Sequence, residues 1–265
     1  MSVQGGRHGG RRRTAIGTLT LTGLLLVSAC SASAPSPAET SSPGPTTSSS
    51  PATMTPTTAG TSSAYSGRDV DDPASATVVV NKARPLDPVD WAPTDLRTVD
   101  GQDVELRAQA ADAAERLLAA AAADGHRLRG ISGYRSYAYQ QRTHAGWVEA
   151  LGAAEADRVS ARAGRSEHQT GLAWDVGDEA HPECDLDRCL GDLDSGRWIA
   201  AHAAEHGFIV RYPEGAETVT GFAYEPWHLR WVGVDATAEV RSAGGVLESA
   251  WGLPAAPAYP DTPDV

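Results

Sequence analysis

The sequence predicts an α+β fold, in a single domain with a small antiparallel sheet and flanking helices. Helical and strand-like patterns alternate between residues 77 and 250. The last two strand-like segments, 208–210 and 222–232, are linked too closely for a helical crossover, which favours antiparallel pairing over a doubly wound parallel sheet. A region of about 175 residues is long enough to bury an ordinary core.

Local patterns place the individual elements. Apolar residues recur at helical spacing from Leu106 to Ala121, and Gly125 can end that helix. Ser136 and Asp194 are suitable N-cap residues for two further helices. The predicted helices are 103–124, 136–152, 194–207 and 235–243, and the predicted strands are 126–132, 173–176, 208–210 and 222–232.

Residues 1–29 are predicted to be a signal peptide of the lipoprotein type. Four arginines precede an apolar stretch, 14–27, that is too short to span a bilayer comfortably. It ends in Val27-Ser28-Ala29-Cys30, which resembles a bacterial lipobox with Cys30 as the lipidated residue. The alternative is an ordinary signal peptide with a cysteine nearby. We therefore expect an exported protein that contacts the membrane through its lipid anchor.

Residues 30–75 are predicted to be a disordered tether rich in Ser, Thr and Pro. Between 31 and 67 the only charged residue is Glu39, and no apolar periodicity is present. Removing residues 1–29 takes away four arginines and no acids, so the net charge changes from −12 to −12 − 4 = −16. This acidic balance argues against a nucleic-acid partner. Cys184 and Cys189 remain as a pair, and we expect a disulfide rather than half of a metal site.

Several hydrolase motifs are excluded. The only lysine, Lys82, has no serine three residues before it, so the S-x-x-K motif of serine enzymes is missing. The motifs G-x-S-x-G and H-E-x-x-H and the nucleotide-binding glycine patterns are also missing. His202, Glu205 and His206 do spell H-x-x-E-H, a metal-binding pattern on a helix. We interpret it as a chance match on an amphipathic helix, because Trp198 and Ile199 lie on or beside the same face.

The stretch SEHQTGLAWD, residues 166–175, is the strongest candidate for a metal site. His168 and Asp175 can supply two ligands, and Gly171 permits a tight turn between them. Farther along, Glu225 lies three residues before His228, which offers a third ligand beside a base. On a flat strand these two side chains face opposite ways, so a bend near Pro226 is required. From the residues alone, a histidine without metal is an equally good interpretation of His168.

Four blocks in order resemble the VanY-type D-Ala-D-Ala carboxypeptidases, zinc peptidases of the bacterial cell wall. They are residues 78–96, 132–140, 166–175 and 207–233. The resemblance implies a zinc D,D-peptidase domain at 76–250, with its zinc site at the sheet, followed by a C-terminal tail at 251–265. Two features depart from the family pattern: Trp174, where a smaller residue is expected, and the cysteine-containing segment 181–192.

The resemblance also implies roles for single residues. His168, Asp175 and His228 correspond to ligands of Zn²⁺, and Glu225 to the base that takes a proton from the attacking water. Arg135 corresponds to the arginine that steadies substrate and developing negative charge. Ser166 and Gln140 correspond to positions that hold the substrate's C-terminal end.

The predicted function is that of a zinc-dependent D,D-carboxypeptidase that hydrolyses the terminal D-Ala-D-Ala bond of peptidoglycan stem peptides. The same site also suits a D-Ala-D-Ala dipeptidase or a peptidoglycan endopeptidase, because the sequence does not give the depth of the pocket. A non-catalytic wall-binding module is the third alternative. We expect a monomer, located at the cell membrane and facing the wall.

Overall fold

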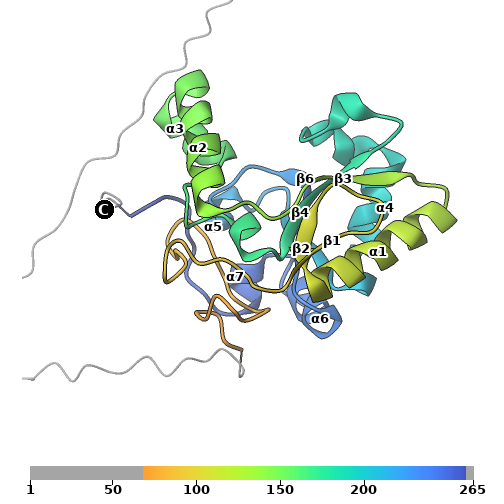
Figure 1. Cartoon of the computed structure of the whole chain (residues 1–265), viewed down its shortest axis with the longest axis horizontal. Coiled ribbons are helices and arrows are strands. Elements are labelled where there is room, and N and C mark those ends of the chain that lie inside the picture. Colours follow the sequence, from red (N-terminus) through yellow and green to blue (C-terminus); the bar gives the residue numbers. More distant parts are fainter. Residues whose placement is uncertain (1–67, 261–265) are drawn as a thin grey trace, which may run out of the picture. The chain divides into compact units, whose positions relative to one another are not determined.

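The computed structural model describes residues 68–260 (Figure 1), so the predicted signal peptide, Cys30 and most of the tether lie outside the described residues. Within this range, no helix combines the length and apolar character needed to cross a membrane. The helices are α1 (Ala108–Ala123), α2 (Tyr137–Leu151), α3 (Ala153–Val159), α4 (Asp194–His202), α5 (Glu217–Thr220), α6 (Val234–Ser242) and α7 (Leu247–Ala250). The strands are β1 (Leu96–Thr98), β2 (Glu105–Arg107), β3 (Leu128–Ser132), β4 (Ala173–Asp178), β5 (Phe208–Tyr212) and β6 (Glu225–Trp231).

The central sheet has four antiparallel strands in the order β3-β4-β6-β5, and β1 and β2 form a separate hairpin. This arrangement confirms the predicted α+β class with a small antiparallel sheet. In the register of β4 and β6, Asp175 lies opposite His228 and Trp174 lies opposite Leu229. Because side chains alternate between the faces of a strand, this register places the two predicted ligands on one face and the two apolar residues on the other.

The main core lies on the face of the sheet that carries Trp174. Trp174 is fully buried and packs against Phe208, with ring centroids 5.9 Å apart. The buried face of α1, which includes Leu117, belongs to the same cluster. Gly130 on β3 leaves room for this packing, because a Cβ there would lie 2.9 Å from a methyl of Val104 and 3.5 Å from the Trp174 ring. Trp174 therefore acts as a core residue on the opposite face of β4 from Asp175.

A second core cluster extends the packed region beyond the predicted boundaries of 76 and 250. Val70, Trp251 and Leu253 are buried there together with Ile209 of β5 and Val240 of α6. Trp251 and Leu253, in the segment predicted as a C-terminal tail, therefore pack against the domain. Such short apolar stretches have no periodicity of their own, so their burial depends on a partner that the local sequence does not show.

Most predicted elements are present, but two helices differ at their ends. The helix predicted from 103 begins only at Ala108, because Leu106 is a buried residue of β2. Asp194 is the first residue of α4 rather than its N-cap, and the helix ends at His202, followed by a 3₁₀ turn up to Gly207. Ser136 does cap α2, since its hydroxyl accepts a hydrogen bond from the Tyr139 amide at 3.3 Å.

Candidate active site

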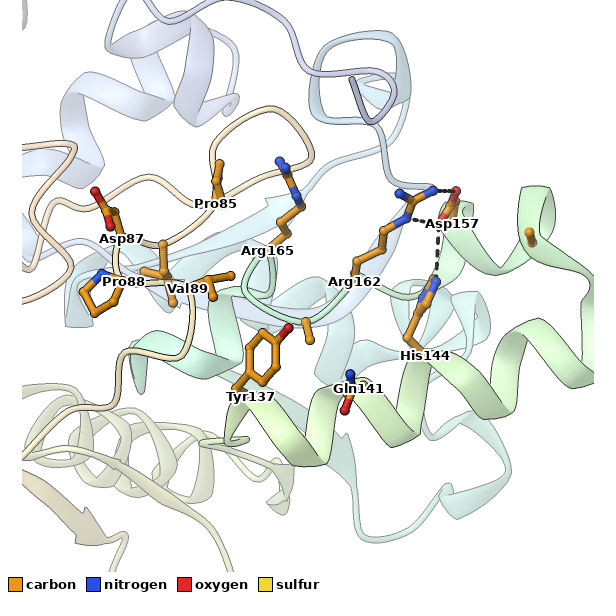
Figure 2. A pocket seen from close by; sticks show the side chains of 13 residues that line it. Pro85, Asp87, Pro88, Val89, Tyr137, Gln141, His144, Asp157, Arg162 and Arg165 are labelled. Carbon is orange, nitrogen blue, oxygen red and sulfur yellow. Dashed lines mark hydrogen bonds and ion pairs between the residues drawn. The ribbon is translucent and has the colours of Figure 1, made fainter. Parts of the chain in front are cut away.

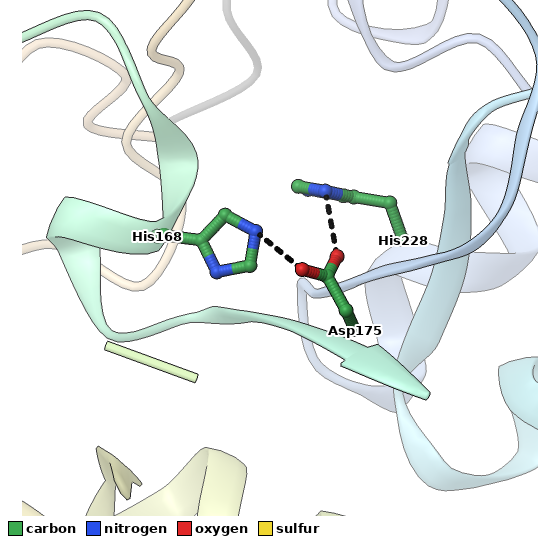
Figure 3. Close-up of side chains that lie close together, drawn as sticks. All are labelled: His168, Asp175 and His228. Atoms are coloured by element: carbon green, nitrogen blue, oxygen red, sulfur yellow. Dashed lines mark ion pairs between the residues drawn. The ribbon is translucent and has the colours of Figure 1, made fainter. Parts of the chain in front are cut away.

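His168, Asp175 and His228 lie together at the ligand-bearing face of the sheet (Figure 3). One ligand atom from each residue can be chosen so that all lie within 4.8 Å of one another, and all three side chains are buried. His168 belongs to a 3₁₀ turn, Glu167–Thr170, that ends at Gly171 with a φ of 68°. This left-handed turn, which favours glycine, leads directly into the strand that carries Asp175.

The hydrogen bonds of the two imidazoles determine which nitrogens face the centre of the cluster. His168 Nδ1 lies 2.7 Å from the carbonyl oxygen of Gly133 and must donate to it, so Nε2 is left facing Asp175 Oδ2 at 3.3 Å. His228 directs Nδ1 toward Asp175 Oδ1, also at 3.3 Å. Oδ1 is buried and has no hydrogen-bond partner among residues 68–260. Two imidazole nitrogens and one carboxylate oxygen form a donor set that suits Zn²⁺ with a further position open.

Glu225 lies on the same side of β6 as His228, with Oε2 3.6 Å from His228 Nδ1. The required bend is present as a bulge. Val210 pairs with Leu229 and Tyr212 pairs with Glu225, so a stretch that advances by two residues on β5 lies opposite one that advances by four residues on β6. Pro226 lies inside the bulge. Burial raises the pKa of Glu225 to about 7, although His228 opposes the shift. A carboxylate with a pKa near neutrality is well suited to accept and return a proton.

Burial affects the two histidines differently. It lowers the pKa of His168 to about 4, and the nearby charge of Arg135 adds to this effect. Burial by itself would also lower the pKa of His228, but contacts with Asp175 and Glu167 raise it to about 9. His168 is therefore already in the neutral form that binds metals, whereas His228 must lose a proton to do so.

Arg135 reaches into the centre of the cluster from the segment between β3 and α2. Its Nη2 lies 2.8 Å from Asp175 Oδ2 and 3.0 Å from His168 Nε2. Its Nε donates to the hydroxyl of Ser132, and its Nη1 donates to Gln140 Oε1 at 3.2 Å. Arg135 therefore presents its guanidinium next to the ligand atoms, held by two neutral acceptors.

Gln140 and Ser166 also line the cavity that contains the cluster, which has a volume of about 610 Å³. Gln140 is buried, and its amide nitrogen donates to the carbonyl of Ala161 at 2.6 Å while its oxygen accepts from Arg135. These contacts orient Arg135, in addition to the substrate contact that the sequence suggests for Gln140. The structure thus brings all seven predicted site residues to one cavity.

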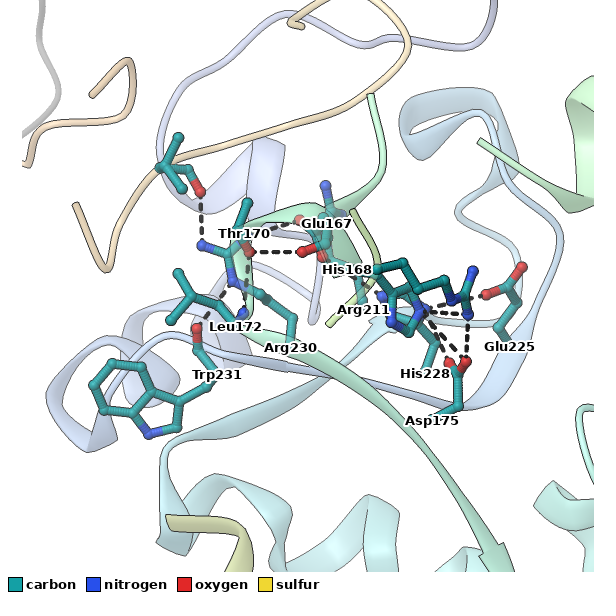
Figure 4. A network of polar contacts seen from close by, with 12 residues as sticks. Glu167, His168, Thr170, Leu172, Asp175, Arg211, Glu225, His228, Arg230 and Trp231 are labelled. Atoms are coloured by element: carbon teal, nitrogen blue, oxygen red, sulfur yellow. Dashed lines mark hydrogen bonds and ion pairs between the residues drawn. The ribbon is translucent and has the colours of Figure 1, made fainter. Parts of the chain in front are cut away.

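A network of buried charges behind His228 was not predicted (Figure 4). Arg211 and Arg230 both donate to Glu167 Oε1, at 2.8 and 3.0 Å, and all three side chains are fully buried. Arg211 also forms a two-pronged ion pair with Glu248 of α7. The remaining oxygen, Glu167 Oε2, faces His228 Nε2 at 3.7 Å.

Glu167 is therefore an outer partner of a predicted ligand. Both Glu167 Oε2 and His228 Nε2 are buried without a hydrogen bond in the described part of the chain. Burial by itself would raise the pKa of Glu167, but Arg211 and Arg230 hold it well below its ordinary range. An available signal in the sequence was the presence of Arg211 and Arg230 inside apolar strand segments, where a charge needs a buried partner.

The H-x-x-E-H pattern does not form a metal site. His202 Nδ1 lies 3.1 Å from Glu205, and the His202 ring stacks on Trp198 with centroids 4.8 Å apart. The group of His168, Asp175 and His228 is the one metal-compatible cluster found within residues 68–260. Cys184 and Cys189 form the expected disulfide, in the loop between β4 and α4.

The Gly133→Ala variant is expected to weaken metal binding, because a Cβ at Gly133 would lie 2.4 Å from the backbone oxygen of Glu105. The backbone must then shift and carry with it the carbonyl that orients His168, and loss of such an outer contact costs about 10- to 100-fold in metal affinity. Competition for zinc with a chromophoric chelator measures the change. Gly146→Ala on α2 is the matched control, since its Cβ would meet no atom within 4 Å. Equal zinc affinity for both variants would contradict the role given to the Gly133 carbonyl.

Residues 103–234 match the family model VanY, D-alanyl-D-alanine carboxypeptidase. The chain is 33% identical over 177 residues to the bifunctional D-Ala-D-Ala dipeptidase and carboxypeptidase VanXYC of Enterococcus gallinarum, covering 64% of this chain and 90% of that one.

Two solved structures are similar over most of their length. The L,D-carboxypeptidase LdcB is 34% identical, with a TM-score of 0.63, over 68% of this chain and 87% of that one. The vancomycin-resistance D,D-pentapeptidase VanY in complex with Zn(II) is 28% identical, with a TM-score of 0.57, over 65% of this chain and 97% of that one. The chain therefore belongs to the VanY family of peptidoglycan carboxypeptidases.

Proposed function

We propose that this protein is a zinc-dependent D,D-carboxypeptidase that removes the terminal D-alanine from peptidoglycan stem peptides. The observation that carries the proposal is the buried cluster of His168, Asp175 and His228, with Glu225 3.6 Å from His228 Nδ1. The similar VanY pentapeptidase binds Zn(II), and its name describes activity on D,D-peptides. A non-catalytic module has no need for a base with a raised pKa beside a complete ligand set.

The proposed mechanism assigns a task to each polar side chain. Zinc held by His168, Asp175 and His228 would polarise the scissile carbonyl and make water more acidic. Glu225 takes a proton from the attacking water and returns it to the leaving amino group of D-alanine. Arg135 presents a fork of donors for the substrate carboxylate or the developing oxyanion. Ser166 and Gln140 bind the C-terminal residue of the substrate, and Gln140 also holds Arg135 in place.

An L,D-carboxypeptidase is the second candidate function, and the similarity to LdcB favours it. Such an enzyme removes the last D-alanine of a tetrapeptide from an L-centre, whereas the D,D-enzyme cuts between two D-residues. The name of VanXYC also includes a D-Ala-D-Ala dipeptidase activity, which is a third candidate specificity for the same site. The three activities would use the same metal site and differ in which part of the substrate binds beside it.

Product masses test the proposal. The zinc-loaded full chain is incubated with a stem pentapeptide ending in D-Ala-D-Ala, with the matching tetrapeptide, and with D-Ala-D-Ala itself, each with and without a chelator. Loss of one alanine from the pentapeptide, stopped by chelator and restored by Zn²⁺, is the expected result. Loss of alanine from the tetrapeptide alone would indicate the L,D-enzyme, and release of a larger fragment an endopeptidase. No cleavage of any peptide by folded, zinc-loaded protein would contradict the enzymatic proposal.

We further propose that the protein is exported, lipidated at Cys30, tethered by the part of residues 30–75 that precedes the packed Val70, and active as a monomer at the membrane. The lipobox-like sequence before Cys30 supports this location, and so does a family that acts on peptidoglycan. Membrane-bound protein in cells, released into the soluble fraction by Cys30→Ala, is the expected result.

A further inference from the structure

Exposed apolar side chains gather at the outer part of the catalytic cavity. Seven large hydrophobic side chains are exposed among residues 68–260, and five of them line the cavity that holds the metal-ligand cluster. The two that lie elsewhere are Val89 and Val234. Exposed apolar side chains that gather at one place mark a binding surface more often than single ones do. The five residues, here called the apolar rim, are Tyr139, Trp147, Leu151, Val159 and Leu186.

One wall of the rim is formed by α2 and α3. Gln140, Trp147 and Leu151 share the side of α2 that lines the catalytic cavity. Tyr137, Gln141 and His144 line a different hollow, which also contains the ion pair of Arg162 with Asp157 (Figure 2). The helix therefore separates two hollows, and the side with the exposed tryptophan is the one that continues from Arg135 and Gln140.

The other wall is the loop closed by the Cys184–Cys189 disulfide. Leu186, at its tip, is 47% exposed and has a φ of 52°, the one positive φ of a non-glycine residue in the described chain. A leucine in this region is strained, and such strain is retained mainly at functional sites. The loop is held by the disulfide, by the Asp187 carboxylate that accepts from the Cys189 amide, and by the ion pair of Asp185 with Arg129. In Figure 1 this teal loop lies on the opposite side of β4 and β6 from α2 and α3.

From this arrangement we infer that the apolar rim binds the residues upstream of the scissile bond in an extended stem peptide. The inference rests on the proposed function, in which the C-terminal D-alanine lies near Arg135. The rest of the substrate must then leave the site along the cavity, between Trp147 and Leu186. A cavity of about 610 Å³ falls in the range of ~300–1,000 Å³ that takes drug-sized ligands, so it has room for more than a dipeptide.

The chemistry of the rim fits that part of the substrate. A stem peptide carries the methyl groups of alanine and the methylene chain of its diamino acid just upstream of the cut bond. Moving these apolar groups from water onto the surfaces of Trp147, Leu151 and Leu186 lowers the free energy of binding. A free D-Ala-D-Ala dipeptide lacks these upstream groups. The rim therefore favours long stem peptides over the dipeptide.

Binding to an inactivated chain tests the rim apart from catalysis. The full chain with Glu225→Gln, loaded with Zn²⁺, is titrated by calorimetry with D-Ala-D-Ala and with the stem pentapeptide. We expect the pentapeptide to bind at least about tenfold more tightly, as one well-packed aromatic contact provides. Adding Trp147→Ala or Leu186→Gly should bring the ratio of the two affinities toward one, whereas Trp147→Phe should keep most of it. Val234→Ala, an exposed apolar residue outside the cavity, should keep all of it.

The results distinguish failure of the apolar rim from failure of the proposed function. A ratio of the pentapeptide and dipeptide affinities near one in the Glu225→Gln background, or a ratio that Trp147→Ala does not lower, would overturn the inference. Tighter binding of a glycan fragment without peptide would also overturn it, because the rim would then be a sugar site. If the pentapeptide binds as expected but the unmodified chain does not cleave it, the proposed function is wrong, whereas peptide binding by the apolar rim is supported. Breaking the disulfide with Cys184→Ser and Cys189→Ser together should lower the ratio as Leu186→Gly does.

Discussion

The Glu225→Gln variant is expected to lower kcat on a D-Ala-D-Ala peptide by about 10²- to 10⁴-fold, the usual contribution of a general base. Glutamine has nearly the same shape as glutamate but cannot accept a proton from water. The side chain lies 3.6 Å from His228 Nδ1 and is not one of the three predicted ligands, so the variant should still bind zinc. Steady-state kinetics and zinc content of the same preparation measure the two properties separately.

Glu149→Gln is the matched control for this variant. Glu149 lies exposed on α2 and does not line the catalytic cavity, so its replacement should leave kcat within experimental error. Full activity of Glu225→Gln would show that another group takes the proton. Loss of zinc together with loss of activity would instead make Glu225 a ligand or a structural support, and the assignment as base would be wrong.

Much of the candidate site was predictable because its residues lie beside short sequence features, a glycine turn and a proline bulge, that determine the local backbone. Gly171 allows the turn between His168 and Asp175, and Pro226 marks the bulge that turns Glu225 to the side of His228. The sequence also placed β4 and β6 as strands, and antiparallel pairing then brings Asp175 opposite His228. The residues alone left open whether His168 belongs to a metal site. The structure places it beside Asp175 and His228 in a cluster that could hold a metal ion, which supports the proposed zinc site.

The supporting structure was harder to predict because it depends on contacts between distant segments. Leu106 fits a helical pattern, yet it is a buried residue of β2, which forms a hairpin with β1, a strand that starts at Leu96. Trp251 and Leu253 pack with Val70, at the other end of the described chain. No local periodicity reports such pairings. The same holds for the buried charges, whose members come from the 3₁₀ turn, β5, β6 and α7.

The buried charges form a balanced set. Glu167 and Glu248 carry two negative charges, and Arg211 and Arg230 carry two positive charges, with all four side chains fully buried. Asn81 adds a hydrogen bond to Glu248 at 3.0 Å. A balanced set such as this adds little net stability, but removal of one charge leaves another uncompensated in a medium of low polarity. Through Arg211 and Glu167, the C-terminal helix α7 is thus connected to the back of His228.

Glu248→Gln should therefore destabilise the zinc-free protein by about 3–5 kcal/mol, because Arg211 loses its two-pronged partner while the volume of the side chain is kept. Urea unfolding of zinc-free protein measures this without a contribution from metal binding. Glu217→Gln is the matched control: it removes the same charge from a half-exposed pair with Arg158 at 2.9 Å, and such pairs contribute about 0–1 kcal/mol. If the two variants lose equal stability, the four charges do not act as a set, and α7 does not support the site through them.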